Sequence, residues 1–138
     1  MTKELFETAV KDGRPVCYYL FRDLGLGKDC KYFVETGTHE GHSVQFALDL
    51  GFDEVLSCEF MTDRYDGCMN RFADNDNVSL WCGTSLEALP GMLENVDKKS
   101  CFWLDAHDEG GGVPTFEELS LIKEHSIKDH TIIIDDVP

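Results

Sequence analysis

Basic residues are scarce in this sequence of 138 residues: 12 lysines and arginines stand against 27 aspartates and glutamates, a formal net charge of −15. Such a charge repels phosphate backbones and anionic lipid surfaces, so we expect no nucleic-acid partner. Long hydrophobic runs are also missing, because none approaches the roughly 18 residues of a membrane-spanning helix. The N-terminus has no basic region followed by an apolar one. We therefore expect a soluble, cytoplasmic protein with no membrane partner.

Cysteine pairs of the Cys-x-x-Cys type are absent. The six cysteines are scattered, and three of them (Cys58, Cys82 and Cys101) fall inside apolar runs that resemble buried strands. Free cysteines of this kind usually pack as small apolar residues, so we interpret them as reduced thiols. A zinc site has little support.

The length leaves room for one ordinary domain, and 42% hydrophobic with 28% charged residues excludes disordered, collagen-like and coiled-coil chains. We predict a single domain over residues 1–138, with an N-terminal helical segment at 2–24 and a core at 31–138. Residues 2–12 show a helical apolar face, whereas residues 16–24 are apolar but follow neither the helical nor the strand period.

From residue 32 the chain alternates short apolar runs with amphipathic segments. This alternation predicts an α/β fold, a doubly wound parallel sheet with helices on both faces, strands buried on both sides and strand order 3-2-1-4-5. The five predicted strands are residues 32–35, 54–59, 78–82, 101–105 and 131–135.

Apolar residues recur at helical spacing between these strands. Two capping boxes, Thr84 with Glu87 and Thr115 with Glu118, predict helix starts at 84 and 115. The four predicted buried stripes are Val44, Ala47, Leu48 and Gly51; Tyr65, Cys68, Met69 and Phe72; Leu86, Leu89, Leu93 and Val96; and Phe116, Leu119 and Ile122.

A glycine-containing turn at residues 35–41 follows the first predicted strand. Gly37 allows a tight turn, and Gly41 allows the next helix to approach the sheet. Glu59 ends the second strand 18 residues after Gly41, close to the roughly 20 at which an acidic residue takes ribose hydroxyls. The dinucleotide fingerprint is absent because His39 stands where its second glycine is needed. The pattern favours a nucleoside without a diphosphate, such as S-adenosylmethionine; an ordinary turn and a solvated strand end are the alternatives.

Carboxylates close the fourth and fifth predicted strands. Asp105 lies at the first of these ends and Asp135 with Asp136 at the second, and strands about 4.8 Å apart would crowd them. A divalent cation such as Mg²⁺ would relieve that repulsion. The two adjacent aspartates converge only if the strand ends and the chain turns there, which Pro138 favours. The alternative is a set of separate caps and solvated loop residues.

His107 follows Asp105 by two residues and lies where it could take a proton from an acceptor hydroxyl. A surface histidine is the alternative, and His39 is a weaker catalytic candidate. The acidic, glycine-rich residues 108–112 suit a lid or a plain connection.

Five ordered motifs resemble the class I S-adenosylmethionine-dependent methyltransferases, and more narrowly the FkbM and TylF-like group with its metal-dependent O-methyltransferase relatives. The resemblance runs from about residue 31 to the end. The motifs are residues 33–41, 55–59, 78–85 with Leu89 and Pro90, 102–107 with the glycines 110–112, and 132–136.

The resemblance implies S-adenosylmethionine as cofactor, with Glu35, Gly37 and Gly41 around its methionine part, Glu59 on the ribose and residues 83–85 at the adenine. It also implies Asp105, Asp135 and Asp136 as metal ligands for Mg²⁺, and His107 with Asp105 as catalytic residues. The implied cofactor-binding set is Glu35, Gly37, Thr38, Gly41, Glu59, Phe60, Gly83, Thr84, Ser85 and Asp105.

Two departures from the family pattern qualify this assignment. The family usually has Asp at the position of Thr84, which here also suits a helix cap. Family members continue past the fifth strand with a helix and two further strands, so the Rossmann-like fold expected here lacks its last two strands.

The expected function is methyl transfer to an oxygen nucleophile of a small-molecule acceptor. The alternatives are a non-catalytic nucleoside-binding module, a truncated domain without an acceptor site, and another activity that consumes the cofactor.

The apolar residues 131–134 would leave one edge of the predicted sheet unpaired. A second copy of the chain would cover that edge, so a homodimer is expected.

Overall fold

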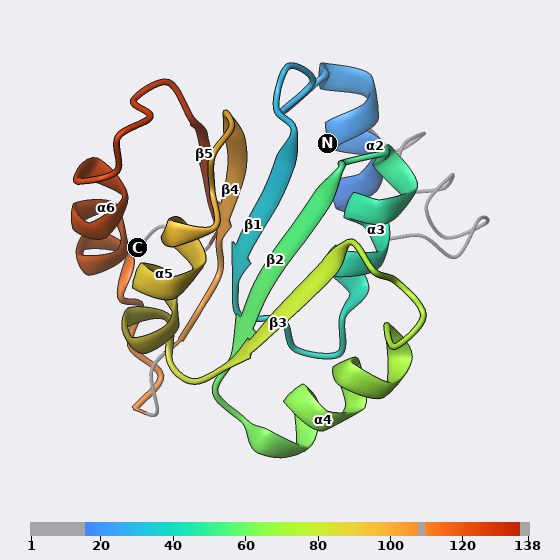
Figure 1. Cartoon of the computed structure of the whole chain (residues 1–138), viewed down its shortest axis with the longest axis vertical. Helices are drawn as coiled ribbons and strands as arrows, with labels where there is room; N and C mark the ends of the chain where they lie inside the picture. The colour runs from blue at the N-terminus through green and yellow to red at the C-terminus, as the bar shows by residue number, and fades with distance from the viewer. Residues whose placement is uncertain (1–15, 108–109, 136–138) are drawn as a thin grey trace.

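The computed structural model describes residues 16–107 and 110–135; the predicted helix at 2–12 and Asp136 lie outside these residues. Five strands form one sheet in the order β3-β2-β1-β4-β5, and every neighbouring pair is parallel (Figure 1). The predicted α/β class and strand order are confirmed. The strands are β1 (Tyr32–Thr36), β2 (Glu54–Glu59), β3 (Val78–Cys82), β4 (Ser100–Leu104) and β5 (Thr131–Ile134).

Helices cover both faces of the sheet (Figure 1). The helices α2 (Val16–Leu24), α3 (His42–Leu50) and α4 (Thr62–Arg71) pack on one face, whereas α5 (Ser85–Glu94) and α6 (Thr115–Lys123) pack on the other. Adjacent strand residues point to opposite faces. Phe33 therefore lies in the core cluster under α2, α3 and α4, Val34 lies in the cluster under α5 and α6, and both are fully buried.

Burial on both faces is confirmed for the three central strands only. The edge strand β3 exposes Ser79 and Cys82, and the edge strand β5 exposes Ile132 to 38%. The prediction of two covered faces is therefore wrong for these two strands, which form the margins of the sheet.

The segment without a clear period becomes the helix α2. Its Phe21 is 2% exposed and contacts the rings of Trp103 at 5.6 Å, Phe46 at 5.4 Å and Phe33 at 6.1 Å between centroids. A helix this short is marginal alone, so the aromatic packing against the sheet stabilises it.

The two predicted capping boxes have different outcomes. Thr84 is the N-cap of α5 and accepts from the Glu87 amide at 3.3 Å, as predicted. The N-cap of α6 is Pro114, whose carbonyl accepts from the Glu118 amide at 2.9 Å. Thr115 is already inside the helix, so the second capping box does not form.

Several predicted stripe residues lie outside the core. Phe116 is 83% exposed, because Glu118, two positions later and about 200° around the helix, takes the inward direction. Met69 and Leu86 are 46% and 41% exposed, since their helices bury a narrower face than predicted. Gly51 is the left-handed C-cap of α3 rather than part of its stripe.

Within the described ranges, no helix is long and apolar enough to cross a membrane. Five cysteines have side chains that the structure describes, and all five are free: Cys30, Cys58, Cys68 and Cys101 are buried, and Cys82 is exposed.

Candidate functional site

A small cavity, with free space of only ≈ 30 Å³, lies at the carboxyl ends of β1, β2, β3 and β4. Ligands of open α/β sheets bind at this edge, where the strand order reverses between β1 and β4. Three other hollows are larger. One lies beside α2, one lies between the ends of α5 and α6, and one lies between α4 and the turn after β1, where it shares His39 and Arg64 with the cavity. The cavity is lined by Gly37, His39, Cys58, Glu59, Phe60, Arg64, Gly83, Ser85, Ala106 and His107.

The turn after β1 is held against its neighbours on both sides. The amides of Gly37 and Thr38 both donate to the Cys58 carbonyl at 2.9 Å. Gly37 has φ of 89°, and a Cβ there would lie 2.9 Å from the Asp105 carbonyl oxygen. Only glycine fits between these strand ends, as the sequence predicts.

Gly41 is required for a different contact from the predicted one. Its φ is 90°, and a Cβ would lie 2.7 Å from the ring of Phe72, just after α4, rather than against the sheet. The glycine therefore lets α4 pack beside the turn. Gly41 does not line the cavity.

Glu59 is the buried carboxylate of the cavity, at 3% exposure. Its Oε1 accepts from the His39 amide at 2.8 Å, and its Oε2 accepts from the Met61 amide at 2.9 Å. One amide belongs to the turn after β1 and the other to the turn after β2, so Glu59 joins these turns. Each oxygen keeps further acceptor capacity for a ligand.

Glu35 lies beneath the turn and is not part of the cavity lining. It is 1% exposed, and it accepts hydrogen bonds from Ser57 Oγ at 2.8 Å and from Ser43 Oγ. Burial raises the pKa of Glu35 to about 8, although the two serine hydroxyls oppose the shift. Its polar contacts therefore support the turn from below.

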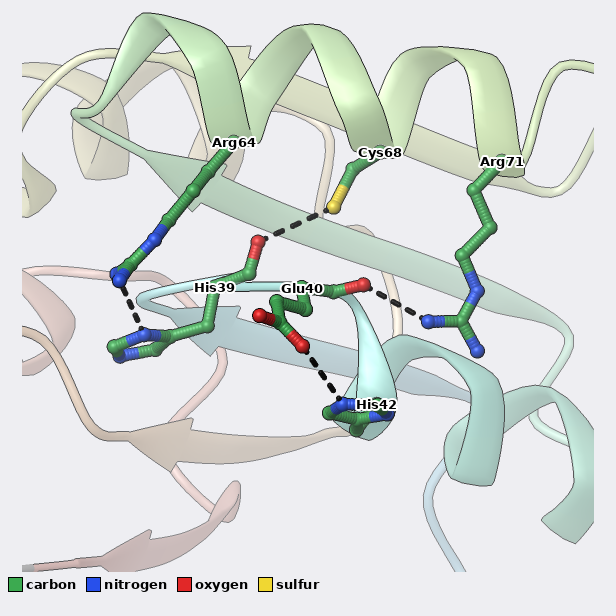
Figure 2. A network of polar contacts seen from close by, with 6 residues as sticks. All are labelled: His39, Glu40, His42, Arg64, Cys68 and Arg71. Carbon is green, nitrogen blue, oxygen red and sulfur yellow. Dashed lines mark hydrogen bonds and ion pairs between the residues drawn. The ribbon is translucent and has the colours of Figure 1, made fainter.

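His39 and Arg64 of α4 line one side of the cavity. Figure 2 shows Arg64 reaching from α4 to His39, where its Nη1 donates to Nδ1 at 2.9 Å. Farther along α4, Cys68 Sγ contacts the His39 carbonyl at 3.4 Å, and Arg71 donates to the Glu40 carbonyl at 2.8 Å (Figure 2). Because Nδ1 accepts from a guanidinium, the proton of a neutral His39 ring resides on Nε2.

Cys58 also lines the cavity, at the end of β2. Burial raises the pKa of its thiol to about 12. The thiolate needed for nucleophilic chemistry is therefore not formed near neutral pH.

The two described acidic strand ends are neighbours. Leu104 and Ile134 are paired across β4 and β5, and the Asp135 amide donates to the Leu104 carbonyl at 3.1 Å. Asp105 and Asp135 directly follow this pair. Within residues 16–107 and 110–135, no group of three potential metal-ligating side chains gathers; Asp136, the third predicted ligand, lies outside them.

The structure places some of the predicted cofactor-binding residues in the cavity lining and the others outside it. Those in the cavity lining are Gly37, Glu59, Phe60, Gly83 and Ser85, and the predicted catalytic His107 joins them. Those outside the lining are Glu35, Thr38, Gly41, Thr84 and Asp105. Thr84 is engaged in capping, since its Oγ1 also donates to Glu87 Oε1 at 2.8 Å.

Three polar residues at this edge are missed by sequence reasoning. Ser57 interrupts an apolar strand, and that interruption is the signal that could have identified it as the partner of Glu35. Glu118 is interpreted as part of a cap and not as a buried group. Arg64 has no distinguishing signal, because a surface arginine on a helix is common.

Comparison with known proteins gives structural neighbours only. No family model and no curated protein sequence matches the chain. The O-methyltransferase from Bacillus cereus in complex with S-adenosylhomocysteine superposes with a TM-score of 0.68 at 18% identity, over 96% of this chain and 64% of that one. The S-adenosylhomocysteine-bound methyltransferase PaMTH1 of Podospora anserina superposes with a TM-score of 0.64 at 15% identity, over 86% of this chain and 49% of that one.

The chain therefore spans less than two thirds of the length of either neighbour. At these identities the comparison concerns the fold. This chain has a Rossmann-like fold shared with these two methyltransferases, with five parallel strands in the order 3-2-1-4-5.

Proposed function

We propose that this chain binds S-adenosylmethionine in the cavity at the strand ends and transfers its methyl group to an oxygen nucleophile of a small-molecule acceptor. The observation that carries the proposal is Glu59, a buried carboxylate at the end of β2 whose two oxygens are each anchored by a backbone amide. This arrangement suits two adjacent ribose hydroxyls, since both can donate to one carboxylate.

The other lining residues supply the rest of a nucleoside site. Phe60, Gly83 and Ser85 line the cavity, and the Phe60 ring would stack on adenine. The turn at Gly37 would take the methionine part, with Glu35 supporting the turn from below. Thr84 is committed to capping α5, so we assign the adenine contact to Ser85 instead.

The acceptor would be activated at the acidic end of the sheet. A divalent metal such as Mg²⁺ would be held by Asp105, Asp135 and Asp136, because hard cations prefer carboxylate oxygens. When bound, it would orient the acceptor hydroxyl and lower its pKa. His107 lines the cavity and would receive the hydroxyl proton.

The transfer itself is a displacement at the sulfonium methyl. The acceptor oxygen forms the new O–C bond as the S–C bond breaks, and S-adenosylhomocysteine leaves. The acceptor must lie within about 3–3.5 Å of the methyl carbon, so positioning is the main task of the site. The resemblance of the five motifs supports the narrower assignment to the FkbM and TylF-like group.

Calorimetric titration with S-adenosylmethionine and S-adenosylhomocysteine, with Mg²⁺ and with EDTA, tests the proposal. We expect both nucleosides to bind and NAD⁺, the matched control with a diphosphate, not to bind. Product analysis with small hydroxylated acceptors then detects methyl transfer, which EDTA should reduce. Binding of neither nucleoside would contradict the proposal, and binding without transfer to any acceptor would favour a non-catalytic module.

A further inference from the structure

A buried carboxyl group lies on the α5 and α6 side of the sheet, outside the cavity lining. Glu118, in the first turn of α6, is 0% exposed, and neither of its oxygens has a hydrogen-bond partner within the described part of the chain. The same is true of the buried Thr115 Oγ1. Polar groups in this condition destabilise a fold, because they lose their bonds to water without replacement.

Helix capping does not account for the burial of Glu118. The predicted capping box of Thr115 and Glu118 does not form, since Pro114 caps α6. The core cluster on this side of the sheet is apolar and includes Leu89, Leu104 and Ile122. Retention of a carboxyl group in such a place is typical of a site where polarity serves function.

Two hydroxyl groups lie beside this carboxyl group, those of Thr36 at the end of β1 and Ser85 at the start of α5. Burial raises the pKa of Glu118, and both hydroxyls oppose that shift, although neither meets ordinary hydrogen-bond geometry here. Ser85 lines the cavity. Thr36 Oγ1 accepts from the Asp105 amide at 3.2 Å. Glu118 thus stands directly behind two elements that border the cavity.

We propose that Glu118 is a positioning residue that sets the base preference of the nucleoside site through Ser85. When the site is filled, Glu118 accepts the hydroxyl proton of Ser85 in a hydrogen bond. The Ser85 oxygen is then left as an acceptor, which suits the exocyclic amine of adenine and opposes the carbonyl of hypoxanthine. A carboxylic acid can accept through its carbonyl oxygen as well, so the bond does not require an ionised Glu118. The inference rests on the proposed cofactor binding.

The test compares the dissociation constants of S-adenosylhomocysteine and S-inosylhomocysteine, which carries a carbonyl in place of the amine. We expect the parent to prefer the adenine form by about tenfold or more, the equivalent of one hydrogen bond. Glu118→Leu should fold with an unchanged or higher melting temperature and lose this preference. Glu118→Gln should retain it, because the amide oxygen still accepts from Ser85. Glu117→Gln, at the exposed neighbouring position, is the matched control and should behave as the parent.

A folded Glu118→Leu variant that keeps the parent preference would overturn the inference and leave Glu118 as a merely structural residue. If leucine prevents folding, Glu118→Asp replaces it: the shorter side chain withdraws the carboxyl group from Ser85, and a retained preference would again overturn the inference. Failure of the parent to bind S-adenosylhomocysteine would instead contradict the proposed function.

Discussion

At the scale of single residues, three buried glutamates, two in the sheet and one in α6, have different environments. Glu59 lines the cavity, Glu35 lies beneath the turn after β1, and Glu118 lies on the opposite side of the sheet. Each is at most 3% exposed. Their hydrogen bonds therefore decide their roles, because burial is common to all three.

Glu59→Ala should weaken the binding of S-adenosylhomocysteine by roughly 1.5–3 kcal/mol, the usual contribution of hydrogen bonds to a charged group. Calorimetry measures the change in the dissociation constant. Glu54→Ala, at the other end of β2, is the control and should bind as the parent does. An unchanged dissociation constant in a folded Glu59→Ala variant would remove Glu59 from the site.

Glu35 should make the stability of the free protein depend on pH. Its pKa is about 8 in the folded chain against 4.5 ordinarily, so above pH 4.5 the unfolded chain releases a proton that the folded chain keeps. Stability should fall as the pH rises from about 4.5 to about 8, by at most about 1.4 kcal/mol per unit. Urea unfolding at pH 5 and pH 8 should show a smaller loss for Glu35→Gln. Equal losses in parent and variant would show that Glu35 is not protonated in the folded state.

At the scale of elements, the pair His125 and His130 connects the amino-terminal side of the sheet with the ends of α5 and α6. The Ser100 amide donates to His130 Nδ1 at 2.9 Å, His130 Nε2 lies 3.0 Å from His125 Nδ1, and His125 Nε2 lies 2.9 Å from the Val96 carbonyl. Each ring accepts at Nδ1 and donates at Nε2, so the chain of bonds needs both rings neutral. The pair thereby links the beginnings of β4 and β5 with the ends of α5 and α6.

Acid should therefore loosen this link. Burial and the neighbouring His125 hold the pKa of His130 below its ordinary 6.5, while Asp129 opposes the shift. The unfolded chain takes up the proton first as the pH falls, so stability should decrease from about pH 7 downward. Melting curves at pH 7 and pH 5 should show a smaller decrease for His130→Asn, whose side-chain oxygen can still accept from Ser100. An equal decrease would exclude His130 as the cause.

The helix α2 depends on Phe21 for its place on the sheet. Phe21→Ala should destabilise the protein by about 3–5 kcal/mol, because it leaves a cavity among aromatic rings. Phe116→Ala removes the same atoms from a ring that is 83% exposed and should change the free energy of unfolding little. Similar unfolding free energies for the two variants would show that α2 does not need this contact.

At the scale of the whole molecule, the outer edge of the sheet remains the basis for the predicted dimer. β5 pairs only with β4 among the described strands, and its Ile132 is 38% exposed. We expect light scattering at micromolar concentration to give twice the chain mass of 15.6 kDa, and Ile132→Lys to shift it toward the monomer. A parent mass of a single chain would contradict the dimer.

The strands, their order and the position of the cavity follow from local patterns in the sequence. Alternating and helical periods are set by backbone geometry, and parallel strands joined by right-handed crossovers leave few arrangements. The glycine turn at Gly37 and the acidic strand end at Glu59 were recognisable for the same reason, because each occupies a place that the topology dictates.

Only tertiary packing decided which side chains of these elements are buried and which hydrogen bonds they make. Residues 16–24 became a helix when aromatic rings of β1, α3 and β4 covered Phe21. Glu118 turned inward and Phe116 outward, against their hydrophobicity. Glu35 and Thr84 were engaged by Ser57 and Glu87 instead of facing the cavity. Such choices depend on contacts between residues distant in sequence, and local periodicity carries no information about them.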